Sequence, residues 1–205
     1  MSVRVLGISA SPRADSNSDI LLRQALAGAE SAGASVEYIR LCDFSIAPCS
    51  ECNACYATGV CIIKDDYQKL SAKLLNTQRL IFATPVFFMN VCAQAKALID
   101  RAQCHWAHRY VLKRELITDA ANRRAMVIAV GGSKSIKMFE SVRLTMKSYF
   151  DALQMRYVGG LFVNKINAAA EIQTHPAALS EAHRLGKELI AASALLEKPI
   201  NIELT

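Results

Sequence analysis

The sequence has little glycine and no long apolar run, and each shortage excludes a class of protein. Only 9 of its 205 residues are glycine, which excludes a collagen-like or glycine-rich architecture. The longest stretch without a charged residue, 80–95, contains Pro85 and is shorter than the roughly 20 residues of a membrane helix. Pro12 and Arg13 come too early for the apolar core of a signal peptide to precede them. We therefore expect a cytoplasmic protein with no membrane association.

The charge pattern gives no sign of nucleic-acid binding. Hydrophobic residues make up 52% of the chain and charged residues 20%, as in a folded domain rather than a disordered one. The net charge is +6, but the basic residues are scattered and lack the run length and aromatic interleaving of a nucleic-acid surface. This balance suits an anionic small ligand or an acidic electron-transfer partner better.

Short apolar strands and amphipathic helices alternate five times along the chain. The expected strands are 4–9, 36–41, 79–84, 125–130 and 157–163, and the expected helices are 19–32, 65–76, 92–105, 135–153 and 176–196. Strict alternation predicts a parallel sheet with helices on both faces. We expect one α/β domain over residues 1–205, a three-layer doubly wound five-stranded parallel sheet of flavodoxin-like order 2-1-3-4-5.

A polar loop after the first strand has the features of an anion site. Free backbone N–H groups and the dipole of the following helix favour an anion there. The chain has neither the phosphate-loop lysine motif nor the dinucleotide glycine motif, which leaves a single phosphate monoester such as that of FMN. Alternatively, Ser16, Asn17 and Ser18 only cap the helix. The candidate residues are Ser9, Ser11, Pro12, Arg13, Ser16, Asn17 and Ser18.

The segment after the third strand is apolar although it lies where a polar loop is usual. We expect Pro85 to end the strand. A flat, mostly apolar surface with backbone groups near its rim suits an isoalloxazine ring. A buried loop or a subunit contact would have the same apolar sequence. The candidates are Thr84, Pro85, Val86, Phe87, Phe88, Met89 and Asn90, together with Gly131 and Gly132 after the fourth strand, which permit close approach.

These segments resemble the NAD(P)H-dependent FMN reductase superfamily, and within it the iron–sulfur flavoproteins. Residues 9–18 resemble the family's FMN phosphate loop, 84–88 its flavin-ring loop, 97–101 the helix that follows, and 48–66 its cysteine segment. The resemblance implies FMN as cofactor, NAD(P)H as a cosubstrate, a ferredoxin-like electron donor and a small-molecule acceptor. It also implies a homodimer or homotetramer.

Four of the seven cysteines lie in one stretch of thirteen residues, inside the cysteine-rich loop 48–64. Cys49, Cys52, Cys55 and Cys61 form the pattern C-x2-C-x2-C-x5-C. Such dense spacing resembles that of [4Fe–4S] binders, whereas zinc usually takes two separated pairs. Zinc and unliganded thiols remain the alternatives. Because the segment follows the second strand, we expect it near the flavin, and we expect Cys42, Cys92 and Cys104 to be buried thiols.

These observations lead to a ranked set of functions. The first is an FMN-dependent oxidoreductase that carries a [4Fe–4S] cluster and passes electrons through FMN to a small acceptor, without a catalytic acid–base side chain. The second is a cluster-free NAD(P)H-dependent FMN or quinone reductase. The third, from another class, is a zinc-binding regulatory module on the same scaffold.

Overall fold

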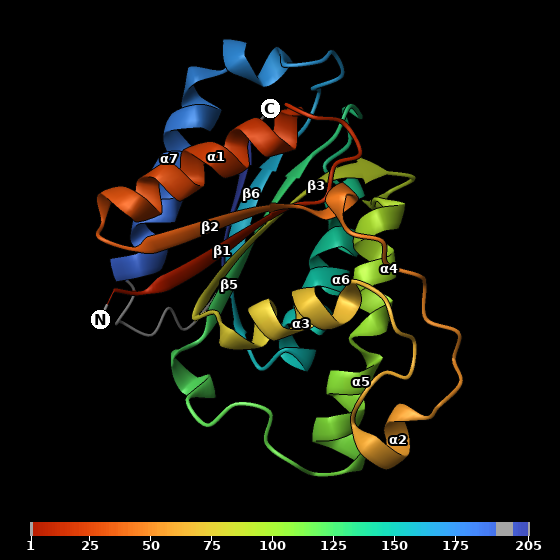
Figure 1. The fold of residues 1–205 in the computed structure, drawn as a ribbon. Helices are drawn as coiled ribbons and strands as arrows, with labels where there is room; N and C mark the ends of the chain where they lie inside the picture. The colour runs from red at the N-terminus through yellow and green to blue at the C-terminus, as the bar shows by residue number, and fades with distance from the viewer. Residues whose placement is uncertain (1, 192–198, 205) are drawn as a thin grey trace.

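A computed structural model describes residues 2–191 and 199–204. Its core is a sheet of parallel strands flanked by helices, the predicted three-layer fold (Figure 1). The strands lie in the order β2 (Ser35–Arg40), β1 (Arg4–Ser9), β3 (Arg79–Phe87), β5 (Arg124–Val130), β6 (Arg156–Val163) and β7 (Ile200–Leu204). The predicted order of the first five parallel strands is therefore confirmed.

The predicted number of strands is wrong, because two further strands join the sheet. β7 extends the edge beyond β6, pairing Ile200 with Gly159 in parallel. Its apolar Ile202 and Leu204 pack against the core on the sheet face covered by α1 and α7, so their burial holds a strand that is too short to stand out in the sequence. The two-residue β4 (Asn90–Val91) folds back antiparallel on β3. Of the expected final helix 176–196, residues 192–196 lie outside the described residues.

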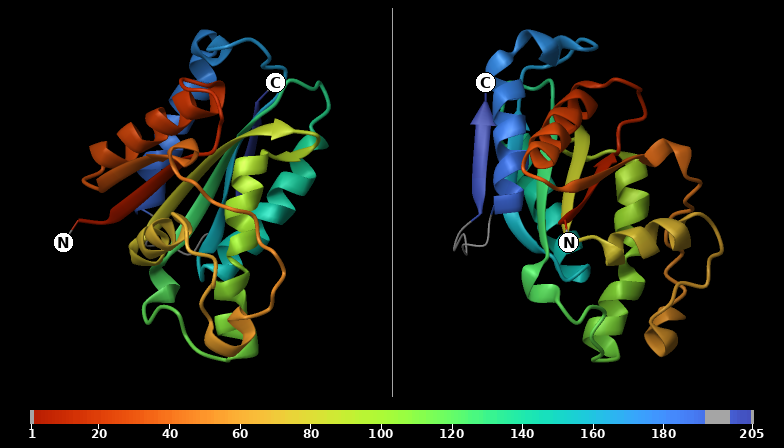
Figure 2. Two further views of the ribbon diagram at one scale, coloured as in Figure 1. Left: turned by 45° about the vertical axis from the view of Figure 1, so that its right-hand side comes forward. Right: turned by 60° about the vertical axis from the view of Figure 1, so that its left-hand side comes forward.

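Two helices cover one face of the sheet and four pack on the other (Figures 1 and 2). The first pair is α1 (Asn17–Ser31) and α7 (Pro176–Ala191). The opposite group is α3 (Tyr67–Asn76), α4 (Ala93–Arg101), α5 (Gln103–Trp106) and α6 (Met138–Ala152). The single turn α2 (Cys55–Thr58), the π-helical turn Ala107–Val111 and three 3-10 turns, Leu41–Asp43, Ala120–Asn122 and Glu171–Thr174, complete the described chain. Within that part, no helix is long and apolar enough to cross a membrane.

Two glycines allow α1 and α7 to touch backbone to backbone. A Cβ atom added to Gly28 would lie 1.9 Å from the carbonyl oxygen of His183, and one added to Gly186 would lie 1.8 Å from that of Ala25. Any side chain there would push the helices apart. Because α1 follows β1, its N-terminus lies at the carboxyl edge of the sheet, where the loop that precedes it can form a site.

Pro85 does not end the third strand, contrary to the sequence-based expectation. β3 continues through it to Phe87, and Pro85 stands opposite Val130 of β5. The pairing of β3 with β1 stops at Ser9 and Ala83, so β3 has only one parallel neighbour where the proline lies. On the open side the missing N–H costs no ladder hydrogen bond, which is where strands tolerate proline.

Candidate functional site

The loop between β1 and α1 is held in shape by its own hydroxyl groups. Ser16 caps α1, since its Oγ accepts a 3.3 Å hydrogen bond from the Asp19 amide, and its hydroxyl also lies 3.3 Å from that of Ser18. The Arg13 amide donates to Ser11 Oγ at 3.2 Å. Ser16 therefore does cap the helix. Capping does not exclude an anion site, because other amides in the first turn of a helix have no acceptor inside the helix.

Two thiols support this loop from behind. Cys92 Sγ donates to the carbonyl of Ala10 at 3.0 Å, and Cys42 Sγ donates to that of Ser11 at 3.3 Å. Cys92 is fully buried, and burial raises the pKa of its thiol, which makes it a structural rather than a reactive cysteine. Cys42 is exposed, so the expectation that it is buried is wrong; it lies in the surface turn Leu41–Asp43 that follows β2.

The predicted loops line one cavity of about 270 Å³ at the carboxyl edge of the sheet. Hydroxyl, amide and guanidinium groups come from the first loop, apolar groups from the end of β3, and glycines from the end of β5. The lining residues are Ser11, Pro12, Arg13, Ser16, Asn17, Ser18, Pro85, Val86, Phe87, Val130, Gly131, Gly132, Ile166 and Asn167. We call this space the loop cavity.

Five of the predicted residues do not line the loop cavity. Ser9 and Thr84 are buried in the strands behind it, where Thr84 Oγ1 accepts from the Cys92 amide. Phe88 and Met89 form the exposed tip of the β3–β4 hairpin. Asn90 turns toward α6, and its Oδ1 accepts a 3.3 Å hydrogen bond from Thr145.

The sequence reasoning missed the loop after β6. Ile166 and Asn167 of that loop line the cavity, and Asn17 ties the loop to α1: its Nδ2 donates to the Ala168 carbonyl at 2.8 Å, and its Oδ1 accepts from the Ile172 amide at 3.1 Å. A usable signal was present, because in a parallel sheet every loop after a strand reaches the same edge.

The four clustered cysteines line a second, larger cavity of about 600 Å³. The segment that carries them runs along the outside of α4 and α5, which form the opposite wall together with α6 (Figures 1 and 2). Cys52 is exposed, Cys49 and Cys61 are half-buried and Cys55 is buried, and burial raises the pKa of the Cys55 thiol. Cys104 of α5 lines the same space and is buried, as expected. We call this space the cysteine cavity.

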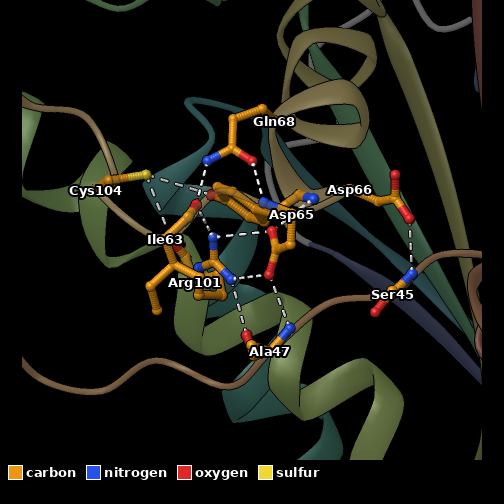
Figure 3. Close-up of polar contacts among 9 residues, drawn as sticks. Ser45, Ala47, Ile63, Asp65, Asp66, Gln68, Arg101 and Cys104 are labelled. Atoms are coloured by element: carbon orange, nitrogen blue, oxygen red, sulfur yellow. Dashed lines mark hydrogen bonds and ion pairs between the residues drawn. The ribbon is translucent and has the colours of Figure 1, made fainter.

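One buried ion pair holds both ends of the cysteine segment (Figure 3). Arg101 of α4 donates to Asp65, to the carbonyl of Ala47 before the first cysteine and to that of Ile63 after the last. Asp65 also accepts from the Ala47 amide at 2.9 Å. The guanidinium lies over the ring of Tyr67, 4.6 Å from its centroid.

Comparison with known proteins places the chain in a family. Residues 3–170 match the NADPH-dependent FMN reductase family. The chain belongs to this family. An iron–sulfur flavoprotein of Methanocaldococcus jannaschii is 29% identical over 204 residues, 96% of this chain and 100% of its own. One of Methanosarcina thermophila is 31% identical over 133 residues, 65% of each chain.

A solved structure supports the fold independently. An NAD(P)H:quinone oxidoreductase from Methanothermobacter marburgensis aligns with a TM-score of 0.72 at 18% identity, over 92% of this chain and 98% of that one. The sheet order and the matched family together make the chain a flavodoxin-like, FMN-dependent oxidoreductase. The resemblance inferred from the sequence is confirmed.

The two cavities are separate within one chain. Among the described residues they share no lining side chain, so the cysteine segment does not border the loop cavity as the sequence reasoning expected. The β3–β4 hairpin lies between them: Val86 and Phe87 face the loop cavity, while Asn90 is hydrogen-bonded to Thr145 in the wall of the cysteine cavity.

Proposed function

We propose that FMN binds in the loop cavity, with its phosphate at residues 11–18 and its ring against residues 85–87 and the glycines Gly131 and Gly132. The observation that carries this proposal is that one cavity joins a hydroxyl-rich helix N-terminus to an apolar strand end. A phosphate needs N–H and O–H donors with a nearby positive charge, and the first loop supplies serine hydroxyls and Arg13. A flavin ring needs the flat apolar surface that Pro85, Val86 and Phe87 provide.

The glycines fit the same placement. A Cβ atom on Gly132 would lie 1.8 Å from the side-chain oxygen of Asn167, and one on Gly131 would lie 2.7 Å from Met138 Sδ. A larger residue at either position would therefore have to displace a neighbouring side chain, Asn167 or Met138, and would change the shape of the cavity wall.

Bound FMN supplies the one- and two-electron chemistry of the reaction. The residues of the chain would bind and orient the cofactor: the first loop would hold its phosphate, and the end of β3 would supply the apolar surface for its ring. Asn17 holds the loop after β6 beside the cavity. This division of labour requires no acid–base side chain of the protein.

We propose that the cysteine cavity holds an iron–sulfur cluster rather than a zinc ion. Within residues 2–191 and 199–204 no three His, Cys, Asp or Glu side chains are close enough to hold one metal ion. The dense C-x2-C-x2-C-x5-C spacing is typical of [4Fe–4S] binders, whereas zinc usually takes two separated pairs. All four cysteines of that pattern, Cys49, Cys52, Cys55 and Cys61, line the one cavity. Relatives of similar sequence bear the name iron–sulfur flavoprotein, which supports the same assignment.

The FMN proposal is tested by comparing two flavins that differ only in the phosphate. FMN binding, measured by fluorescence quenching, should be at least about 100-fold tighter than riboflavin binding, since charge-assisted hydrogen bonds to a phosphate are strong. Arg13→Gln should shrink this ratio about tenfold. Arg184→Gln on α7, whose charge pairs with Glu181 and Glu188, is the control and should leave the ratio unchanged. Equal affinity for both flavins would refute the placement.

The cluster proposal is tested by iron content and absorbance after anaerobic purification. Cys52→Ser should lose most of the iron and the broad absorption that accompanies it. Cys42→Ser is the matched control, because Cys42 is likewise exposed but does not line the cysteine cavity. If Cys52→Ser kept its full iron content, the cluster would not be held by this segment.

The second candidate is a cluster-free NAD(P)H-dependent FMN or quinone reductase. The structural likeness to an NAD(P)H:quinone oxidoreductase favours it. Iron-free protein separates the two: rapid bleaching of bound FMN by NADPH in the iron-free form would support this candidate. If a ferredoxin-like donor reduces the FMN only in the iron-loaded protein, the cluster-containing oxidoreductase is supported instead.

A further inference from the structure

The first turn of α1 carries a capping motif of which only half is formed. Ser16 and Asp19 stand three positions apart before an apolar run, the pattern in which each side chain binds the backbone amide of the other residue. Ser16 Oγ does accept a hydrogen bond from the Asp19 amide, at 3.3 Å. The return bond is not made, because in the part of the chain that the structure describes the Ser16 amide donates to no acceptor.

Two other residues hold the Asp19 carboxylate instead. Tyr38 of β2 donates its hydroxyl to Oδ1 at 2.6 Å, and Arg23, one turn further along α1, donates Nε to Oδ2 at 3.0 Å. The Arg23 guanidinium also lies over the Tyr38 ring, 4.6 Å from its centroid. Asp19 is buried, with 2% of its surface exposed, and both of its carboxylate oxygens are engaged. The carboxylate therefore bonds toward the second turn of α1 and not back to the start of the helix.

This arrangement leaves a row of amides without acceptors beside the loop cavity. Among the described residues the amides of Asn17 and Ser18 donate to no acceptor either, and all three of these first-turn residues line the cavity. Ser16 and Ser18 are almost wholly buried, with 7% and 1% of their surface exposed. Buried amides are nearly always paired, so these amides call for an acceptor that the chain itself does not supply.

We propose that Tyr38 and Arg23 are positioning residues that keep the Asp19 carboxylate off the first-turn amides, which stay free for the phosphate of FMN. This inference rests on the proposed function, which places the phosphate at residues 11–18. A carboxylate bonded back to the Ser16 amide would occupy a donor that the phosphate needs and would repel the phosphate through its like charge. Neither Tyr38 nor Arg23 lines the loop cavity, so both act through Asp19.

The test is the ratio of FMN affinity to riboflavin affinity in Tyr38→Phe, measured by fluorescence quenching. The variant keeps the ring and removes the hydroxyl that holds Oδ1, so the carboxylate can turn back to Ser16. FMN should bind about tenfold more weakly, the order of one lost hydrogen bond to a charged group, whereas riboflavin should bind as it does to the parent. Tyr157→Phe is the matched control, since its hydroxyl bonds to Asn201 of β7, at the opposite edge of the sheet from β2, and the ratio should not change.

A double variant separates competition by the carboxylate from a simple loss of structure. Asp19→Ala in the Tyr38→Phe background removes the competing anion, so FMN affinity should return to within about twofold of the parent, whereas two independent structural defects would add. Inorganic phosphate gives a readout without flavin. At equal concentration it should raise the melting temperature of flavin-free Tyr38→Phe less than that of the flavin-free parent.

Two results would overturn the inference. One is an unchanged affinity ratio in Tyr38→Phe, and the other is a double variant that binds FMN no better than Tyr38→Phe alone. Failure of the proposed function gives a different result, because the parent protein would then bind FMN and riboflavin equally tightly, and this inference would fall with it.

Discussion

Arg101 and Asp65 form a two-pronged ion pair, with nitrogen–oxygen distances of 2.6 and 3.2 Å, inside the wall of the cysteine cavity. Both partners also bind Ala47, one through its carbonyl and the other through its amide. One pair therefore fixes the two chain segments that bracket the four cysteines. Loops are ordinarily mobile, and this pair replaces the missing secondary structure with buried polar contacts.

Removing the carboxylate should therefore loosen the cysteine segment. Asp65→Asn leaves the buried Arg101 charge without its counter-ion, and we expect the free energy of unfolding to fall by about 3 kcal/mol. Asp66→Asn is the adjacent control: Asp66 accepts from the Ser45 amide and pairs with Lys69 near the surface, so a clearly smaller loss is expected. Urea denaturation of both variants at pH 7 measures the difference, and equal losses would contradict the role of the pair.

His105 should make the protein sensitive to acid. Burial, followed by the charges of His108 and Arg123, lowers the pKa of His105 to about 4, against roughly 6.5 in an unfolded chain. Between these values the unfolded chain binds a proton that the folded chain does not. Stability is therefore complete above about pH 6.5 and falls as the pH drops toward 4, by roughly 3 kcal/mol from this group.

Urea denaturation at pH 7, 5.5 and 4.5 measures this effect. His105→Gln, which can still bond to Ser71, should show a shallower loss of stability between pH 6.5 and 4.5 than the parent. His183→Gln on α7 is the control and should reproduce the slope of the parent. A slope in His105→Gln as steep as that of the parent would mean that other groups cause the acid sensitivity.

The sequence predicted the elements that repeat and missed those defined by tertiary contact. The first five parallel strands and their order follow from apolar runs such as that of residues 79–84, whose periodicity is local. β7 could not be assigned in the same way, because only pairing with Gly159–Val163 of β6 makes five alternating residues a strand. The prediction that Pro85 ends the third strand was wrong for a related reason. A proline interrupts a strand only where a neighbouring strand needs its N–H, and β1 does not extend along β3 as far as Pro85.

In the candidate site, too, residues with a local sequence signal were predicted and residues placed by tertiary contacts were missed. The polar first loop and the glycines at 131 and 132 carry local signals, and the structure brings them to one cavity. The role of Asn167 depends on how the loop after β6 is folded by Asn17, 150 positions away along the chain. The ion pair between Arg101 and Asp65 could not be predicted either: both residues lie in segments that resemble the family, 97–101 and 48–66, but the spacing within a segment does not say which residues of two segments pair.

The hairpin tip should take part in self-association, which we propose for this protein. Phe88 is fully exposed, Phe87 and Met89 are half-exposed, and the backbone of Phe88 and Met89 is left-handed, a costly conformation for large side chains. Such an apolar tip is typical of a surface that is covered in an assembly. Phe88→Ser should shift the protein toward monomer in sedimentation velocity without changing the free energy of unfolding of the monomer. An oligomer of unchanged stability in this variant would contradict the prediction. Leu144→Ser, an exposed apolar residue of α6, is the control.

A methyl group at Gly132 should weaken FMN binding without unfolding the protein. Its Cβ atom would lie 1.8 Å from Asn167 Oδ1, so the asparagine side chain must move, and the shape of the loop cavity changes with it. We expect Gly132→Ala to bind FMN about tenfold more weakly, equivalent to about 1.4 kcal/mol, in a fluorescence titration. Asn167→Ala serves as a comparison, because it removes the same side chain without adding the methyl group. If Asn167→Ala binds FMN normally while Gly132→Ala does not, the methyl group itself obstructs the cofactor; if both bind FMN as tightly as the parent does, this turn does not border the flavin.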